Sequence, residues 1–322
     1  MNKGMKRIIG ILCAGAAALL GSCSQMFSAK TAAEMQPSYL VMETNNERVL
    51  FSQNANERRP IGMLANIATA IVVMDWMKAK NVSMDTMLTV PAGACRWPST
   101  NLLHLQPGEQ ISLRDALHSC LMWDDSACAT TMAYACGYTL STGDPEGAFV
   151  AQMNNMARTI GMNATNFKGS NGSVVSTAST RDLALLGMYA MERELMQGIC
   201  AKASYTATIN GSAGARQVQI NNTNRMLSSQ GVDGLRAANS RTAGCCIIAS
   251  AKRGSVKAYN PQLGKESTYA QRLLVIVLGM PDSNARYQKA AALLNDGWGA
   301  WEAWQKTSDM TDSSKFIRLP KN

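Results

Sequence analysis

The stretch RPIGMLANIATAIVVMD, residues 59–75, decides how this chain folds. It is almost wholly apolar, and no glycine or proline follows Gly62 within it. Proline fits the first turn of a helix, so Pro60 indicates where a helix begins. The stretch therefore predicts a buried helix that starts near Pro60 and continues through residues 61–77.

Segments on either side of this helix predict further regular elements. Tyr39–Met42 and Val49–Phe51 are short apolar runs around Asn45-Asn46, a pattern typical of a β-hairpin. Downstream, the apolar spacing predicts three more helices, at 113–135, 145–160 and 180–191. The first half of the chain is thus a strand pair followed by helices.

The second half changes from helical to β-like character. Runs rich in β-forming residues predict strands at 203–209, 217–220, 243–251 and 273–278. A last helix is expected at 283–304, where Trp298, Trp301 and Trp304 lie near one face and are expected to pack on the sheet. This order predicts an α+β fold in which a helical region is inserted into a sheet.

The composition limits the class of protein. A chain of 322 residues with 46% apolar and 16% charged residues can bury a sizeable core, which argues against general disorder. Its formal charge is +9, and Lys3, Lys6 and Arg7 in the first segment contribute three of these charges. A mildly basic domain suits an anionic envelope polymer or a membrane surface. No nucleic-acid-binding motif occurs, so nucleic acid is not expected as a partner.

Residues 1–22 have the three parts of a signal sequence. The apolar part, Ile8–Leu20, is shorter than the roughly 20 residues that span a membrane. Leu20-Gly21-Ser22-Cys23 fits the bacterial lipoprotein pattern, which implies cleavage before Cys23 and lipidation of its sulfur. Residues 23–37 would then be the lipidated cysteine and a tether, and the protein would be anchored facing the periplasm. An ordinary secretory signal is the alternative.

Seven further cysteines follow Cys23. An exported protein could pair some of them, but the number is odd, and buried structural thiols are the simpler interpretation. The cysteines have no C-x-x-C spacing, and histidine is limited to His104 and His118. Neither a metal nor a cofactor is therefore expected.

Several strings together resemble the serine D-Ala-D-Ala carboxypeptidases, the low-molecular-mass penicillin-binding proteins. They are the hairpin at 39–51, Arg59-Pro60-Ile61 with residues 69–75, the run from Phe149 to Phe167, Ser176-Thr177-Ala178 with Asp182-Leu183-Ala184, Asn222 to Leu227, and Gly231 to Leu235. The resemblance covers residues 38–305. It implies the serine β-lactamase/D,D-peptidase-like fold, an antiparallel sheet flanked by helices.

The resemblance also implies a chemistry, acyl transfer at the terminal D-Ala-D-Ala bond of peptidoglycan. A serine attacks the carbonyl, and a lysine one helical turn later takes its proton. A Ser-x-Asn motif helps proton transfer and holds the substrate amide, while a Lys-Thr-Gly strand binds the terminal carboxylate. All three motifs are broken in this chain.

At the first motif, ungapped alignment from Pro60 places Met63 in the nucleophile position and Asn66 in the lysine position. Methionine has no proton to lose, and asparagine is not a base near neutral pH. A slip of one residue offers Gly62 and Ala65, which are no better. No catalytic residue is therefore intact at this motif.

The other two motifs differ as well. Asp124-Asp125-Ser126 holds the Ser-x-Asn position, and its adjacent carboxylates are expected at a solvated loop or helix end rather than as an acid–base pair. Arg236-Ala237-Ala238 replaces Lys-Thr-Gly. Arg236 can still bind a carboxylate and is the predicted ligand contact, whereas Ala238 would narrow the pocket.

The leading hypothesis is a non-catalytic member of the family that binds peptidoglycan stem peptides or an envelope protein. One alternative is an active hydrolase with a non-standard nucleophile, such as Ser126 or a cysteine. Another is a structural lipoprotein without a ligand. The carboxypeptidase-like domain is expected at 38–305, and residues 306–322 are expected to form a polar tail.

Overall fold

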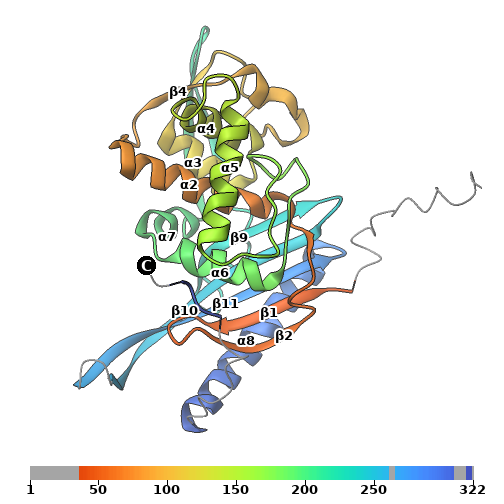
Figure 1. Cartoon of the computed structure of the whole chain (residues 1–322), viewed down its shortest axis with the longest axis vertical. Helices are drawn as coiled ribbons and strands as arrows, with labels where there is room; N and C mark the ends of the chain where they lie inside the picture. The colour runs from red at the N-terminus through yellow and green to blue at the C-terminus, as the bar shows by residue number, and fades with distance from the viewer. Residues whose placement is uncertain (1–35, 261–264, 308–316, 321–322) are drawn as a thin grey trace, which may run out of the picture.

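The structure is a computed structural model that describes residues 36–260, 265–307 and 317–320. The predicted signal sequence, Cys23 and residues 24–35 of the expected tether lie outside this range. A helical region stands above a sheet-based region in Figure 1. None of the described helices is both long and apolar enough to cross a membrane.

A five-stranded antiparallel sheet forms the lower part of the fold (Figure 1). Its strands, in the spatial order β2-β1-β11-β10-β9, are β1 (Ser38–Glu43), β2 (Arg48–Gln53), β9 (Val232–Ser240), β10 (Gly244–Asn260) and β11 (Lys265–Met280). The predicted hairpin is confirmed as β1 and β2. The strands predicted at 243–251 and 273–278 are confirmed within β10 and β11, which are both longer.

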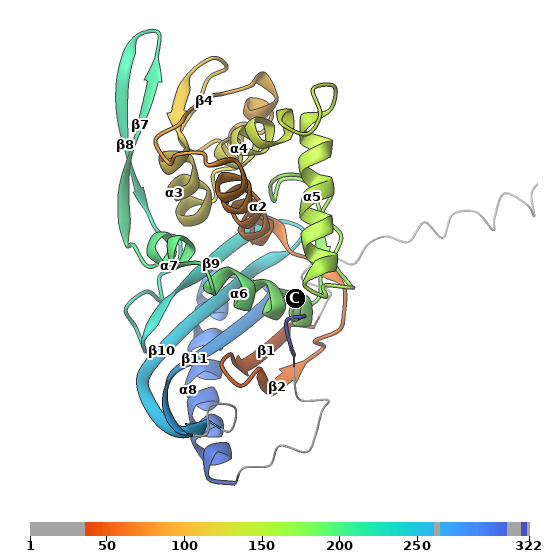
Figure 2. The same ribbon diagram turned by 60° about the vertical axis from the view of Figure 1, so that its left-hand side comes forward.

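Helices cover both faces of this sheet because its central strand is apolar on both sides. Along β11, the side chains from Leu273 to Leu278 alternate between two buried hydrophobic clusters. Helix α6 (Thr180–Met191) packs on one face and α8 (Ser283–Thr307) on the other (Figure 2). Both helices occupy the ranges that the sequence predicts.

A helical region is inserted between β2 and β9, as the sequence predicts. Its helices are α2 (Ala65–Lys80), α3 (Leu113–Trp123), α4 (Ser126–Tyr138), α5 (Pro145–Thr159), α6 and α7 (Glu194–Cys200), with 3-10 turns at Gly62–Leu64, Ala92–Arg96 and Pro98–Thr100. A four-stranded antiparallel sheet borders it, formed by β4 (Met87–Thr89), β5 (Gln110–Ser112), β7 (Ser204–Gly211) and β8 (Gly214–Asn221). The short strands β3 (Arg59–Pro60) and β6 (Thr177–Ala178) pair with each other.

Helix α2 is the buried centre of this region. Every side chain from Ala65 to Met74 is buried, so this part of the helix is enclosed by protein on all sides. The helix begins later than predicted, because Pro60 lies in β3 opposite Thr177. Gly62 then has a φ of 51°, which an α-helix cannot continue, and a 3-10 turn leads into α2.

The single helix predicted at 113–135 is instead two helices, so this prediction is wrong. Asp124 has a left-handed backbone (φ 64°) that ends α3. Asp125 then caps α4, because its side chain accepts a hydrogen bond from the Cys128 N–H at 2.7 Å. The break falls at the residues assigned to the second motif.

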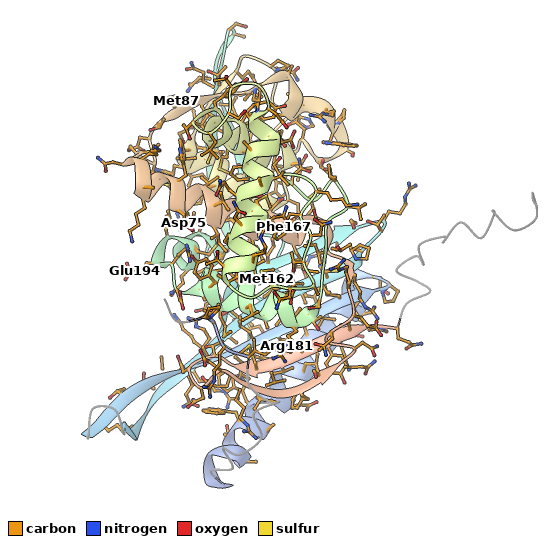
Figure 3. All side chains as sticks on the ribbon, viewed as in Figure 1. Asp75, Met87, Met162, Phe167, Arg181 and Glu194 are labelled. Carbon is orange, nitrogen blue, oxygen red and sulfur yellow. The ribbon has the colours of Figure 1, made fainter. Side chains whose placement is uncertain are left out.

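The run from Phe149 to Phe167 holds α5 against the loop that follows it. Phe149, Met153, Met162 and Phe167 are all buried, and Figure 3 labels the last two. The Asn154 side chain donates to Phe167 O at 2.8 Å and accepts from Phe167 N at 2.9 Å. The Asn154 amide thus satisfies the N–H and the carbonyl oxygen of Phe167, which have no access to water. This explains why a polar residue lies within the run.

Two features near the C-terminus bear on the expected boundaries. Trp298 and Trp301 of α8 are buried against the sheet, as predicted, and the side chain of Trp304 lies outside the described residues. Ile317 is buried, and its N–H donates to Glu47 O at 2.9 Å. The expectation of a polar tail is wrong for 317–320, because an apolar side chain in this segment is buried in the domain core.

Candidate functional site

The residues assigned to the family's catalytic positions meet at one place. Met63 comes from the turn before α2, Asn66 from the first turn of α2, Asp124 from the α3–α4 junction and Arg236 from β9. The Arg236 side chain joins them: its Nε donates to Met63 O at 3.0 Å, and its Nη2 contacts Asp124. The structure thus brings together the positions that the resemblance assigned to one site.

The guanidinium of Arg236 is enclosed by protein. Its Nη1 donates to Cys120 O at 2.6 Å and also contacts Leu121 O. All three guanidinium nitrogens therefore have protein partners, and the side chain is 0% exposed. A ligand carboxylate would have to replace Asp124 to reach Arg236, so the ligand role of this residue stays a prediction.

Asp124 supplies the counter-charge for this buried guanidinium. Its side chain is 18% exposed. Burial raises the pKa of Asp124 because it disfavours the charged carboxylate, while the positive charge of Arg236 opposes that shift. An acidic side chain thus occupies the position where the resemblance places a serine.

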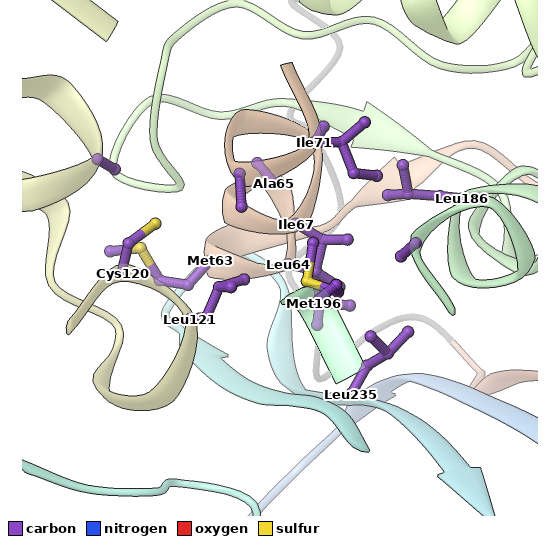
Figure 4. Packing of buried hydrophobic residues seen from close by; sticks show 14 of the residues in the cluster. Met63, Leu64, Ala65, Ile67, Ile71, Cys120, Leu121, Leu186, Met196 and Leu235 are labelled. Atoms are coloured by element: carbon purple, nitrogen blue, oxygen red, sulfur yellow. The ribbon is translucent and has the colours of Figure 1, made fainter. Parts of the chain in front are cut away.

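Met63 and Asn66 provide neither a nucleophile nor a base. Met63 is buried, and Figure 4 shows its side chain directed toward Cys120 and Leu121 of α3. The Asn66 Nδ2 donates to Cys120 O at 3.4 Å, and its Oδ1 has no hydrogen-bond partner in the described part of the chain. A neutral amide and a thioether cannot exchange a proton with a substrate near neutral pH.

The loop at 168–176 approaches Met63 closely. A Cβ added at Gly172 would lie 2.3 Å from the Met63 Cα, so only glycine fits there. Gly169 and Gly172 lie in a polar loop, a pattern typical of close backbone approach. The predictions from the sequence did not include this contact.

Ser126, the alternative nucleophile, belongs to a small hydroxyl cluster. Its Oγ lies 2.6 Å from Thr100 Oγ1 and donates to Thr100 O at 3.0 Å. Thr100 Oγ1 also lies 3.1 Å from Ser173 Oγ. These contacts supply no imidazole, lysine or carboxylate that would take the serine proton. No motif in the sequence singles out Thr100 or Ser173.

Asp124 and Asp125 do not form a carboxylate pair. Asp125 is fully buried and accepts from the N–H groups of Leu103 and Cys128 at 2.8 and 2.7 Å. Burial raises the pKa of Asp125, and these N–H groups oppose the shift. The predicted helix end is present, but the expected solvation is wrong, because backbone N–H groups take the place of water.

Ala237 and Ala238 are both buried, and they belong to the clusters on opposite faces of β9. The Ala238 carbonyl oxygen accepts from Arg286 Nη1 at 3.1 Å. The Ala237 carbonyl oxygen accepts from Thr223 Oγ1 at 3.0 Å. Within this strand motif, Arg236 is therefore the residue whose side chain could contact a polar ligand.

Burial makes the thiols of this region poor nucleophiles. Five of the seven described cysteines are buried, and all seven are free thiols, which supports the interpretation as structural residues. Burial raises the pKa of Cys120 and of Cys200 to about 12, so both stay protonated near neutral pH. The described residues contain no group of three His, Cys, Asp or Glu side chains that could hold a metal.

Two cavities lie away from Arg236. One of about 440 Å³ is bounded by α2 and α5, with Trp76 and Tyr189 in its wall. Another, of about 470 Å³, lies at the tip of the β7–β8 hairpin beside Glu109 and Arg216. Neither is lined by any of the residues that meet at Arg236.

His118 lies on α3, apart from this centre. Its ring stacks on Tyr205, with ring centroids 3.7 Å apart, and its Nδ1 lies 2.8 Å from Arg114 O. Its Nε2 lies 3.0 Å from Lys202 Nζ. Burial lowers the pKa of His118 to about 4, so the ring is neutral near pH 7. Because its contacts include no serine, His118 does not form a Ser-His-Asp arrangement.

The buried imidazole predicts a pH dependence of stability. We expect the free energy of unfolding to fall as the pH is lowered from about 6.5 to about 4, because the unfolded chain binds a proton that folded His118 does not. The loss approaches about 1.4 kcal/mol for each pH unit in this window. His118→Phe, which keeps a ring on Tyr205, should remove this part of the dependence. Urea unfolding at several pH values measures it, and an equal loss in both proteins would contradict the assignment.

Comparisons with known proteins agree with the resemblance. A family model described as D-alanyl-D-alanine carboxypeptidase matches residues 25–266. The D-alanyl-D-alanine carboxypeptidase DacC of Escherichia coli is 25% identical over 307 residues, which cover 90% of this chain and 69% of that protein. The D-alanyl-D-alanine carboxypeptidase DacA of Escherichia coli is 28% identical over 239 residues, covering 70% of this chain and 55% of that protein.

Solved structures share the fold. A Streptomyces DD-transpeptidase is 23% identical with a TM-score of 0.70, and the match covers 81% of this chain and 96% of that one. A penicillin-binding protein of Listeria monocytogenes in its ampicillin-bound form is 25% identical with a TM-score of 0.62, with the same coverage. These likenesses confirm the predicted α+β fold of the serine β-lactamase/D,D-peptidase type.

Proposed function

Because this chain belongs to the D-alanyl-D-alanine carboxypeptidase family, we propose that it is a non-catalytic member, a lipoprotein that contacts peptidoglycan stem peptides or an envelope protein without cleaving them. Its curated relatives DacC and DacA are carboxypeptidases, and the chain spans 69% and 55% of their lengths. The scaffold is retained, whereas the residues at the motif positions cannot perform acyl transfer.

The enclosure of Arg236 is the observation that carries this proposal. Acyl transfer needs a nucleophile, a proton acceptor and space for the substrate carbonyl. Met63 and Asn66 supply neither of the first two. The guanidinium takes up the space between them and Asp124, since it bonds to the Met63 and Cys120 carbonyl oxygens at 3.0 and 2.6 Å.

Penicillin tests the absence of catalysis, because it mimics D-Ala-D-Ala and traps the acyl-enzyme as an ester. We expect no covalent adduct after saturating exposure of the purified chain to fluorescent penicillin, by denaturing gel and by intact mass. An active carboxypeptidase of the family serves as the positive control. A stoichiometric adduct would overturn the proposal, and mapping it to Ser126 or a cysteine would favour the active-hydrolase alternative.

Peptidoglycan sedimentation tests the ligand. The terminal carboxylate of a stem peptide would compete with Asp124 for Arg236, so Asp124→Asn should increase the bound fraction. Asparagine still accepts a hydrogen bond from the guanidinium but removes the competing negative charge. Thermal unfolding of the variant checks that it is folded. Binding that is unchanged in Asp124→Asn would place the peptidoglycan contact, if present, on another surface.

The packed centre also favours a second candidate, a structural lipoprotein without a ligand. Met63 is 4% exposed, and Trp123 packs against the main hydrophobic cluster. Side chains therefore fill the region where the resemblance places the substrate. In that case neither the unchanged chain nor Asp124→Asn would sediment with peptidoglycan. Membrane attachment through Cys23 belongs to both candidates, and Cys23→Ser should move the chain to the soluble fraction of lysed cells.

A further inference from the structure

Strand β8 forms an outer edge of the four-stranded sheet β4-β5-β7-β8. Figure 2 shows the β7–β8 hairpin at the margin of the molecule, with β8 outermost. An edge strand presents a row of backbone N–H and C=O groups that can pair with another strand.

The register of the hairpin identifies which groups face outward. A two-residue turn joins Gly211 to Gly214, and the pair that closes such a turn is hydrogen-bonded. Hydrogen-bonded and non-hydrogen-bonded pairs alternate along the hairpin from this turn. The bond from Asn222 N to Ala203 O at 2.8 Å agrees with this alternation, because Asn222 is an even number of residues from Gly214. The backbone groups directed away from β7 therefore belong to Ala215, Gln217, Gln219 and Asn221. None of them bonds to a residue that the structure describes.

Other sheet edges are short, bulged or covered, but β8 is none of these. The outer side of β9 is covered, because Thr223 and Asn224 side chains donate to the carbonyl oxygens of Ala237 and Gly234 at 3.0 and 3.1 Å. Strand β4 has only three residues, and the β1–β2 pair contains a bulge. Strand β8 has eight residues, without proline, lysine or an acidic side chain, which are the usual protections of an edge.

We propose that β8 pairs antiparallel with β8 of a second copy of this chain, centred on Val218. This register places Ala215 opposite Asn221 of the other copy and Gln217 opposite its Gln219, so every outward backbone group finds a partner. The Gln217 and Gln219 side chains share one face, where their amides can hydrogen-bond across the strands. Arg216 is the single charge on the strand, and the two copies place it at opposite ends.

The strand is thus complementary to itself, which favours a twofold contact with a second copy over an unrelated peptide. Two sheets would join into one across the axis. This contact involves no residue of the centre around Arg236. The proposed pairing can therefore be tested independently of the proposed function.

Cysteine cross-linking of the full chain in cells tests the register. In this register, Val218 lies opposite Val218 of the second copy, and the two residues form a non-hydrogen-bonded pair. Their Cα atoms are about 4.5 Å apart, a separation that a disulfide can span. Oxidation of Val218→Cys should give a disulfide-linked dimer at least about tenfold more abundant than in Gln217→Cys or the unchanged chain, whose matching positions lie too far apart. Equal dimer in these three chains, or a cross-link to a different protein, would overturn the proposal.

A proline variant tests the edge itself. Gln219→Pro in the Val218→Cys background removes an outward N–H and leaves the β7 hydrogen bonds of β8 in place, because Gln219 N–H points away from β7. We expect the dimer to be lost while thermal unfolding stays unchanged. Val218→Pro is the matched control, since it removes a bond within the hairpin and should lower the unfolding temperature. Persistence of the cross-link in a folded Gln219→Pro chain would contradict the proposed pairing.

Discussion

Arg236→Met should lower the free energy of unfolding by about 3–5 kcal/mol, because it leaves the Asp124 carboxylate largely buried without its counter-charge. The substitution also strips the Met63 and Cys120 carbonyl oxygens of a donor that reaches them at 3.0 and 2.6 Å. Buried acceptors without a partner cost more than a hydrogen bond gains on average. Urea unfolding followed by circular dichroism measures the change.

Two controls separate the ion pair from other effects of removing an arginine. Arg114 and Asp85 form an exposed pair at 2.9 Å, with side chains 45% and 76% exposed, so Arg114→Met should cost about 0–1 kcal/mol. The double variant Arg236→Met with Asp124→Asn should recover part of the loss, because it removes the unpaired charge. A loss below about 1 kcal/mol in Arg236→Met would show that this pair does not hold the centre together.

Gly172→Ala should have an effect of similar size, about 3 kcal/mol, because the new methyl group meets backbone rather than a movable side chain. Its Cβ would lie 2.3 Å from Met63 Cα, 2.4 Å from Met63 N and 2.5 Å from the carbonyl carbon of Gly62. Either the loop at 168–176 or the turn before α2 must shift to accommodate it. The shift disturbs the packing around Arg236, because the Arg236 side chain donates to the Met63 carbonyl oxygen.

Gly198 provides the matched control for this substitution. It lies within α7, and a Cβ added there meets nothing within 4 Å. Gly198→Ala should therefore be neutral or stabilise the protein by up to about 1 kcal/mol, as expected for glycine in a helix. If Gly172→Ala unfolds at the same urea concentration as the unchanged chain, the close contact between the loop and Met63 is not present in solution.

Both predictions concern the positions that the family resemblance assigns to catalysis. In this chain, a buried ion pair and a close backbone contact occupy those positions, and both are stabilising features. The side chains of Met63 and Arg236 are buried in this centre, which supports the proposed non-catalytic role. The two stability experiments therefore alter the same contacts on which the proposed non-catalytic role rests.

Local sequence patterns are sufficient to predict the fold class and most of the elements. The apolar run at 61–77 predicts α2, and alternation and β-forming residues predict the hairpin and the later strands, because these patterns depend on neighbours close in the chain. The ordered family strings then placed Met63, Asn66, Asp124 and Arg236 at one site. Local pattern could not place the end of α3, since Asp124 interrupts a helical pattern that continues on both sides of it.

The contacts that these residues make when they meet depend on tertiary packing. Arg236 contacts the backbone around residues 63 and 120, which are more than 100 positions away along the chain. Whether a guanidinium faces a ligand or a buried aspartate depends on how such distant segments pack, and no local spacing encodes that. The outward edge of β8 has the same origin. The sequence shows which residues β8 contains. Its position at the edge of a sheet depends on which strands pair in three dimensions.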